Sequence, residues 1–182
     1  LILFHFCYNP CSLFIPKVIY SGKEYRQSEK QDRRTQEKME GVVIIGAGQA
    51  AAQTAASLRQ EKFEGPITIF GDESEFPYQR PPLSKDYLAG KISVEKTLVR
   101  PQEFYNSKNI AVNLNTRIKE IDPEKNTIST ESAETHEYDN LVIATGSRAR
   151  ELKIPGSELN GIHYLRSIKD VDSIRDEMRT AR

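Results

Sequence analysis

The sequence has few cysteines and no long apolar run. Its two cysteines, Cys7 and Cys11, are too few for the disulfide framework that small proteins of oxidising compartments use to hold their fold. A membrane-spanning helix needs about 20 consecutive, mostly apolar residues, and no stretch of the chain reaches that length. These absences favour a cytoplasmic globular protein over a secreted or membrane-spanning one.

An excess of charge of either sign is also absent. The 26 basic and 26 acidic residues cancel, so the charge balance indicates neither a groove for nucleic acid nor a basic face for a membrane. Among 182 residues, 29% are charged and 37% are apolar, which is typical of one globular domain with a core. A metal site built from His5, Cys7 and Cys11 is conceivable, but no matching second pair of ligands follows, so no metal is expected.

The first 40 residues differ from the rest of the chain. Residues 1–20 are apolar and aromatic, but they lack the basic start and the cleavage pattern of a secretory signal. Residues 21–40 are polar and dense in charge, and the first methionine is Met39. We therefore expect residues 1–40 to be a flexible or non-native extension, and residues 41–182 to form the domain.

A regular pattern begins at residue 41. Residues 42–45 are a continuous apolar run, which is typical of a parallel strand buried on both faces. The glycine-rich turn at residues 46–48 is followed by an alanine-rich segment, residues 49–62, that is compatible with a helix. Residues 67–70 then form a second β-type run. Strand, turn, helix and strand within about thirty residues predict a βαβ unit.

The prolines of residues 76–83 predict a loop, because proline restricts both itself and the residue before it. Ser84 can then cap a short helix over residues 85–89, which Gly90 would close. Residues 101–108 are another short helical candidate.

Short strands are predicted for residues 110–140, with a turn at residues 122–126. Residues 141–144 form a further buried apolar strand. A last helix should start at Ser167, with Asp170 at the capping-box position. The pattern as a whole predicts an α/β domain with a parallel sheet and a small antiparallel β-meander.

The glycine turn matches the pattern G-x-G-x-x-G/A in the context that gives this pattern meaning, since it follows a strand and opens a helix. Gly46 would permit the tight turn, and Gly48 would let a pyrophosphate approach the backbone at the positive end of the helix. Ala51 stands at the third position, where alanine is tolerated. The alternative is an ordinary glycine turn in an α/β domain.

An acidic residue about twenty positions further on is the second half of this fingerprint. Asp72 fits it, because a carboxylate at the end of the second strand would accept hydrogen bonds from the ribose hydroxyls of an adenosine. Glu73 is the alternative candidate. Together the two features predict a dinucleotide site.

Four segments resemble the FAD-dependent pyridine nucleotide-disulphide oxidoreductases and, within them, the ferredoxin and rubredoxin reductase branch, which is similar to apoptosis-inducing factor and monodehydroascorbate reductase. The segments are Gly-Val-Val-Ile-Ile-Gly-Ala-Gly, Gly-Asp-Glu, Pro-Tyr-Gln-Arg-Pro-Pro-Leu-Ser-Lys and Leu-Val-Ile-Ala-Thr-Gly-Ser. The resemblance implies a Rossmann-like FAD-binding domain. It also implies an N-terminal fragment, incomplete at its C-terminus, because the family's nicotinamide fingerprint would follow the last helix.

The resemblance further implies roles for individual residues. Lys85 would lie near the flavin ring, where a fixed ammonium favours the anionic reduced flavin, and it is the catalytic candidate. Ile118 would meet the adenine through its backbone. The implied FAD-contacting set is Gly46, Ala47, Gly48, Ala50, Asp72, Arg80, Lys85, Ile118, Ala144, Thr145, Gly146 and Arg166. Alternatively, Arg80 and Lys85 are solvated surface charges. His136 and His163 are expected to be structural or exposed.

The implied function is transfer of electrons from NAD(P)H through FAD to a ferredoxin- or rubredoxin-type carrier. Residues 73–87 contain no cysteine, although disulfide reductases of this superfamily carry a cysteine pair there, so dithiol chemistry is not expected. The alternative is a non-catalytic nucleotide-binding or interaction fragment. A plain NAD-dependent dehydrogenase is disfavoured, because it would lack the Arg-Pro-Pro-Leu-Ser-Lys loop.

Overall fold

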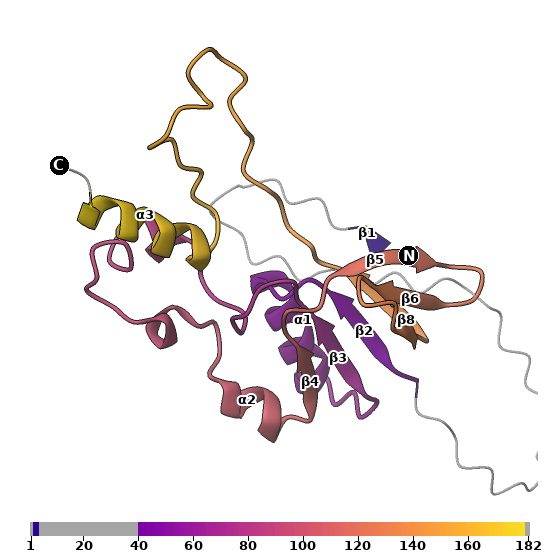
Figure 1. Cartoon of the computed structure of the whole chain (residues 1–182). Helices are drawn as coiled ribbons and strands as arrows, with labels where there is room; N and C mark the ends of the chain where they lie inside the picture. Colours follow the sequence, from indigo (N-terminus) through magenta and orange to yellow (C-terminus); the bar gives the residue numbers. More distant parts are fainter. Residues whose placement is uncertain (1, 4–39, 181–182) are drawn as a thin grey trace, which may run out of the picture.

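The computed structural model describes residues 2–3 and 40–180, which form two sheets and the helices that flank them (Figure 1). The larger sheet is parallel, with the strand order β1-β8-β2-β3-β4, and the smaller one is antiparallel, with the order β5-β6-β7. The parallel strands are β1 (Ile2–Leu3), β2 (Val42–Ile45), β3 (Ile67–Phe70), β4 (Ile110–Asn113) and β8 (Asn140–Ile143). The antiparallel strands are β5 (Ile118–Asp122), β6 (Thr127–Thr130) and β7 (Thr135–Glu137). The predicted α/β fold with a parallel sheet and a β-meander is confirmed.

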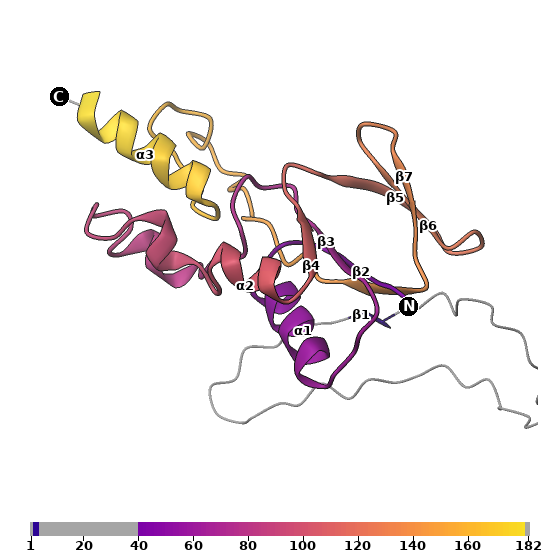
Figure 2. The same cartoon turned by 90° about the horizontal axis from the view of Figure 1, so that it is seen from below.

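Both faces of the parallel sheet are covered, so the core has one apolar layer on each side of this sheet. Figure 2 shows α1 (Gln49–Gln60) on one side of this sheet and the antiparallel sheet on the other. Val42 and Ile44 pack toward α1, whereas Val43 and Ile45 pack toward Ile128 of β6. All four residues of β2 are therefore buried, as the apolar run predicted.

The predicted βαβ unit is confirmed, but α1 ends at Gln60, two residues earlier than expected. Lys62 takes a left-handed conformation (φ 62°), and the Phe63 N–H bonds back to the Leu58 carbonyl at 2.9 Å. Arg59 stabilises this ending, since its Nη1 donates to the carbonyls of Phe63 and Gly65 at 2.5 and 2.8 Å. The Arg59 side chain thus stabilises the C-terminal end of α1, which comes before Gly65.

The prediction for residues 76–90 was wrong in two respects. A 3-10 helix, η1, covers Pro81–Ser84, where a loop was expected, and the expected helix over residues 85–89 is a series of turns. Prolines in the first turn are tolerated because their missing N–H groups would have no partner within the helix. Ser84 therefore ends a short helix instead of capping one, and Lys85 has non-helical torsions (φ −128°, ψ −112°). A second 3-10 helix, η2 (Val94–Thr97), follows.

The two remaining α-helices were predicted. The first, α2 (Gln102–Ser107), packs Tyr105 into the same apolar cluster as the buried face of α1. The second, α3 (Ile168–Thr180), begins with the predicted capping box: the Asp170 carboxylate accepts the Ser167 N–H at 2.7 Å, and the Ser167 hydroxyl accepts the Asp170 N–H at 3.3 Å. Burial alone would raise the pKa of Asp170, but the backbone N–H donors outweigh it and hold this pKa below its usual range.

Helix α3 packs on the segment between β3 and α2, away from the sheet (Figures 1 and 2). A separate apolar cluster joins the two, made of Tyr78, Leu83, Tyr87, Ile168 and Val171. Met178, near the other end of α3, is 65% exposed. The chain from β8 to α3, residues 147–165, runs away from the sheet as a long loop (Figure 1).

Few predictions about the first 40 residues can be compared with the structure. His5, Cys7, Cys11 and Met39 lie outside the described residues. Strand β1 was not predicted; it pairs in parallel with β8 at Val142 and Ile143. Within residues 2–3 and 40–180, no cluster of His, Cys, Asp or Glu could hold a metal ion, and no helix is long and apolar enough to span a bilayer.

Replacing Tyr105 by phenylalanine is expected to leave stability unchanged or to raise it by about 1 kcal/mol, because a buried hydroxyl without a partner carries a desolvation cost. Tyr105 is fully buried, and its hydroxyl has no hydrogen-bond partner among the described residues. Burial also raises the pKa of Tyr105 to about 12. Urea unfolding measures the change, with Tyr87→Phe as the control that loses a hydrogen bond to Asp172 of 3.1 Å. A clear loss of stability in Tyr105→Phe would contradict this account.

Candidate nucleotide-binding site

Three predicted site segments meet at one edge of the parallel sheet. Because β8, β2 and β3 are adjacent and parallel, their carboxyl ends lie side by side. The Gly46 N–H donates to the Phe70 carbonyl at 2.7 Å, and the Ala144 N–H donates to the Ile45 carbonyl at 2.7 Å. The structure therefore brings the glycine turn, the segment containing Asp72 and residues 144–146 together.

Gly46 makes the turn possible. Its φ is 104°, in the left-handed region that favours glycine. A Cβ at this position would lie 2.4 Å from the carbonyl oxygen of Ala144, which is closer than real Cβ atoms approach. Gly46 is thus required by the contact between the ends of β2 and β8.

Gly48 is different, because space is open beside it. It is the N-cap of α1, with extended backbone torsions (φ −99°, ψ −170°), and no atom lies within 4 Å of the position that a Cβ would take. No side chain caps the helix, and its first turn contains no acidic residue. The free N–H groups can therefore donate hydrogen bonds to an anion beside Gly48, and the positive end of the helix would attract it, as binding of a pyrophosphate requires.

Asp72 opens onto a polar hollow of about 540 Å³ between the end of β3 and the antiparallel sheet. The loop before β5 is tied to this strand end, since the Thr116 N–H donates to the Gly71 carbonyl at 2.7 Å. Ile118, the next predicted contact, packs into the apolar cluster under the antiparallel sheet, and its backbone pairs with Thr130. The residues that line the hollow are Asp72, Asn115, Thr116, Arg117, Thr130, Glu131, Ser132 and Glu134. Except for Asp72, sequence reasoning missed them, because their proximity depends on how the two sheets pack.

Glu73, the alternative ribose acceptor, is engaged elsewhere. One of its carboxylate oxygens accepts the Tyr78 hydroxyl at 2.5 Å, and the other accepts Nη2 of Arg80 at 2.5 Å. Glu73 does not line the hollow. Of the two neighbouring acids, Asp72 is therefore the one that opens onto the hollow, and its contact with a ribose stays a prediction.

Arg80 and Arg166 lie next to each other, although they are far apart in the sequence. Nη1 of Arg80 donates to the Arg166 carbonyl at 2.6 Å and to the Tyr78 hydroxyl at 2.7 Å. The Arg166 guanidinium lies against Gly146, with Nη2 3.3 Å from the position of a Cβ there. Contact of Arg80 with a cofactor stays a prediction, because the contacts that the structure shows for its side chain are with protein atoms.

Lys85 is exposed, on the turn after η1. Among the described residues its ammonium has no ion-pair or hydrogen-bond partner. Its place beside a flavin ring stays a prediction. His136 packs on the Phe70 ring, with 4.8 Å between the ring centroids, and His163 pairs with Glu177, so both have structural contacts.

The model of the family described as pyridine nucleotide-disulphide oxidoreductase matches residues 40–182. The chain belongs to this oxidoreductase family. Residues 1–39 lie outside the match.

Curated members of the pyridine nucleotide-disulphide oxidoreductase family confirm the predicted resemblance to the ferredoxin and rubredoxin reductase branch. A ferredoxin–NAD(P)(+) reductase of Sphingomonas sp is 42% identical over 137 residues, which are 75% of this chain and 33% of that protein. A rubredoxin–NAD(+) reductase of Pseudomonas putida is 40% identical over 137 residues, which are 75% of this chain and 36% of that protein. The chain thus spans about a third of the length of the curated relatives that it matches.

Solved structures agree with this placement in the oxidoreductase family. The ferredoxin reductase for the CYP199A2 system from Rhodopseudomonas palustris superposes with a TM-score of 0.72 at 38% identity, covering 78% of this chain and 35% of that one. The covalent putidaredoxin reductase–putidaredoxin complex gives a TM-score of 0.70 at 34% identity, covering 76% and 34%.

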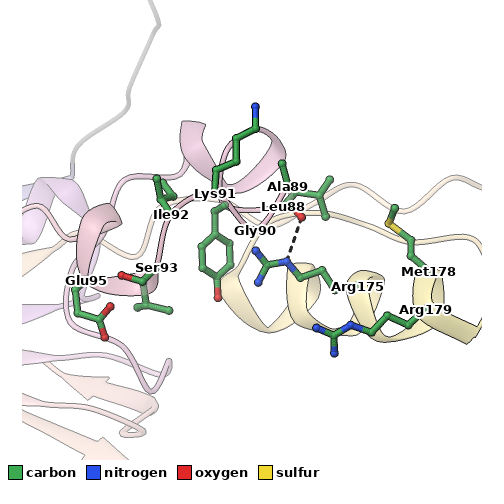
Figure 3. Close-up of a pocket in the computed structure, with 12 residues that line it drawn as sticks. Leu88, Ala89, Gly90, Lys91, Ile92, Ser93, Glu95, Arg175, Met178 and Arg179 are labelled. Carbon is green, nitrogen blue, oxygen red and sulfur yellow. Dashed lines mark hydrogen bonds between the residues drawn. The ribbon is translucent and has the colours of Figure 1, made fainter.

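A second hollow, of about 750 Å³, lies between residues 87–95 and α3 (Figure 3). Arg175 crosses it, donating from Nε to the Leu88 carbonyl at 3.1 Å and lying 4.4 Å from the Tyr87 ring. None of the predicted site residues lines this hollow. Arg175 therefore holds α3 against residues 87–95, away from the strand ends.

Proposed function

We propose that this chain forms the FAD-binding part of an NAD(P)H-dependent reductase that serves a ferredoxin- or rubredoxin-type electron carrier. The observation that carries the proposal is the open space beside Gly48 at the uncapped start of α1, on the same sheet edge as Asp72. The names of the relatives support the reaction class. Because the chain spans about a third of their length, the activity is proposed for the whole protein.

Each part of an FAD molecule has a proposed partner on this edge. Gly46, Ala47, Gly48 and Ala50 would surround the pyrophosphate at the start of α1. Asp72 would accept the ribose hydroxyls, and Ile118 would meet the adenine through its backbone. On the other side, toward the flavin, we place Arg80, Lys85, Ala144, Thr145, Gly146 and Arg166.

The cofactor would supply the chemistry, since a flavin accepts a hydride as a pair of electrons and releases single electrons to a carrier. The contribution of the chain is to bind and orient it and, at Lys85, to hold a positive charge near the ring. No cysteine occurs among residues 40–180, so we propose no dithiol step. We further propose a cytoplasmic protein without nucleic-acid or membrane partners, in line with its balanced charge.

A second candidate function is a nucleotide-binding fragment without catalysis. The short coverage of the relatives favours this candidate for the isolated chain. A visible spectrum of the purified protein, recorded before and after addition of NADH or NADPH, distinguishes the two. A yellow protein that NAD(P)H bleaches supports the reductase; a yellow protein that NAD(P)H leaves unchanged supports the second candidate; a colourless protein that takes up no added FAD contradicts both.

The substitution Asp72→Asn is expected to weaken FAD binding about tenfold, because hydrogen bonds to a charged acceptor contribute about 1.5–3 kcal/mol. Asp72 is exposed, so the fold should not change. Fluorescence titration with FAD measures the dissociation constant. The matched control is Asp176→Asn, which removes an exposed carboxylate of α3 paired with Arg179 at 3.2 Å. Equal affinities in both variants would rule out the ribose role of Asp72.

A further inference from the structure

The Tyr78 hydroxyl is the centre of a hydrogen-bond network that sequence reasoning did not find. It donates to Glu73 at 2.5 Å, and it accepts Nη1 of Arg80 at 2.7 Å and the Ile168 N–H at 3.2 Å. A phenol has one donor and two acceptor positions, and all of them are used. Tyr78 is 3% exposed, so water does not compete for these bonds.

The network joins three parts of the chain that are distant in sequence. Glu73 follows β3, Tyr78 and Arg80 precede η1, and Ile168 begins α3 (Figure 1). Burial and the bond to Glu73 both raise the pKa of Tyr78, so the hydroxyl keeps its proton at any physiological pH. The network therefore connects the end of β3 to the start of α3 through a tyrosine hydroxyl that stays protonated.

The backbone on both sides of Ser167 is held by this network. Arg80 donates to the Arg166 carbonyl at 2.6 Å, while the Tyr78 hydroxyl holds the Ile168 N–H. Asp170 accepts the Arg166 N–H from a third side, at 2.9 Å. The main chain at Arg166 consequently has little freedom to move.

Because the main chain at Arg166 is fixed, the position from which its side chain extends is fixed as well. Its Nη2 lies against Gly146, at the end of β8, and its Nε is buried without a hydrogen-bond partner among the described residues. Buried N–H donors are nearly always paired in native structures, so an unpaired one beside a predicted cofactor site indicates a missing acceptor. An anionic group of the cofactor would provide it.

We propose that Tyr78 is a positioning residue, which fixes the Arg166 backbone so that the Arg166 guanidinium is presented at the end of β8 to the bound dinucleotide. Arg80 supports the same peptide through its bond to the Arg166 carbonyl. The inference rests on the proposed function for the identity of the ligand, but the anchoring itself is a property of the chain.

The test compares Tyr78→Phe with Tyr87→Phe. Tyr87 belongs to the same apolar cluster, is 4% exposed and also bonds to α3, through Asp172 at 3.1 Å, but it does not reach Arg166. In Tyr78→Phe, amide hydrogen exchange at residues 166–168 should become faster, and the FAD dissociation constant should rise about tenfold. In Tyr87→Phe, both should remain within about twofold of the unmodified chain.

A double-mutant cycle shows whether the effect passes through Arg166. In the Arg166→Ala background, Tyr78→Phe should change FAD affinity by less than about twofold, because two residues that act as one unit are not additive. Glu73→Gln is a second, milder variant that keeps an acceptor for the Tyr78 hydroxyl, and it should produce a smaller loss of affinity in the same direction.

The outcomes separate the two proposals. Unchanged exchange at residues 166–168 in Tyr78→Phe would overturn the positioning role, whatever the affinity for FAD. An equal loss of affinity with and without Arg166 would also overturn it. If exchange becomes faster but the unmodified chain binds no FAD, the anchoring is upheld and the proposed function fails.

Discussion

Replacing Gly48 by valine is expected to weaken FAD binding about a hundredfold and to leave the chain folded. The backbone at Gly48 is extended (φ −99°, ψ −170°), which any residue adopts, and no atom lies within 4 Å of the position of a Cβ. The protein itself therefore has room for the valine. The space that the side chain would fill is the space assigned to the pyrophosphate, so protein and phosphate would compete for it.

The two effects should differ widely in size. Losing the phosphate contacts is expected to cost about 3 kcal/mol of the binding free energy of FAD. This cost corresponds to a rise of about a hundredfold in the FAD dissociation constant. The free energy of unfolding should fall by no more than about 1 kcal/mol, the usual size of an N-cap effect. FAD titration and urea unfolding of the same sample measure both. Gly48→Ala is the graded control and should bind FAD with intermediate affinity. Retention of FAD by a folded Gly48→Val protein would show that the phosphate lies elsewhere.

The elements that sequence predicts well are those whose cause is local. The apolar run of β2 predicted burial on both faces, and neighbouring residues alone determine that pattern. The capping box of α3 was likewise predictable, because Ser167 and Asp170 are three residues apart. The turn at Gly46 belongs to the same class, although its closest neighbour, Ala144, could not be named in advance.

The parts that could not be predicted depend on contacts across the fold. Arg80 meets the Arg166 carbonyl, and Tyr78 meets the Ile168 N–H, over separations of 86 and 90 residues. A sequence pattern reports the chemistry of these side chains but not their partners, so the bonds that Arg80, Tyr78 and Glu73 make with one another and with the start of α3 were not predicted. The wrong prediction at η1 has another origin. Two prolines were taken to exclude a helix, although Pro81 and Pro82 occupy its first turn, where they are compatible with it.

Asp72 and Glu73 are adjacent acids at the end of β3 that have different surroundings in the structure. Asp72 was the predicted acceptor of the ribose hydroxyls, and Glu73 was the alternative. Glu73 lies in an ion pair with Arg80 at 2.5 Å, whereas Asp72 opens onto the hollow beside the antiparallel sheet. In the proposed FAD site the network of Glu73 would hold Arg166 on the flavin side, and the hollow of Asp72 would lie on the adenosine side, so the adjacent acids would serve opposite ends of one ligand.

The substitution Gly46→Ala is expected to destabilise the fold itself. A non-glycine residue at a φ of 104° costs about 1–2 kcal/mol. The added Cβ would also lie 2.4 Å from the Ala144 carbonyl oxygen and 2.9 Å from the Thr145 Cα, both backbone atoms that cannot rotate away. Separating β2 from β8 to relieve this overlap should cost a further 1–3 kcal/mol, roughly as overpacked cores do. The sum, about 3 kcal/mol, is a large share of the stability of a small domain.

Urea unfolding should therefore show a large fall in midpoint for Gly46→Ala, whereas Gly48→Ala, two residues away, should unfold near the unmodified chain. A Gly46→Ala protein as stable as the parent would mean that the strand ends are further apart than the structure shows. FAD affinity would fall in both variants but for different physical reasons. In Gly46→Ala it should recover to the extent that the folded population is restored, for instance by lower temperature or a stabilising osmolyte. In Gly48→Ala it should not recover, because there the protein is already folded and the added methyl group occupies the place of the phosphate.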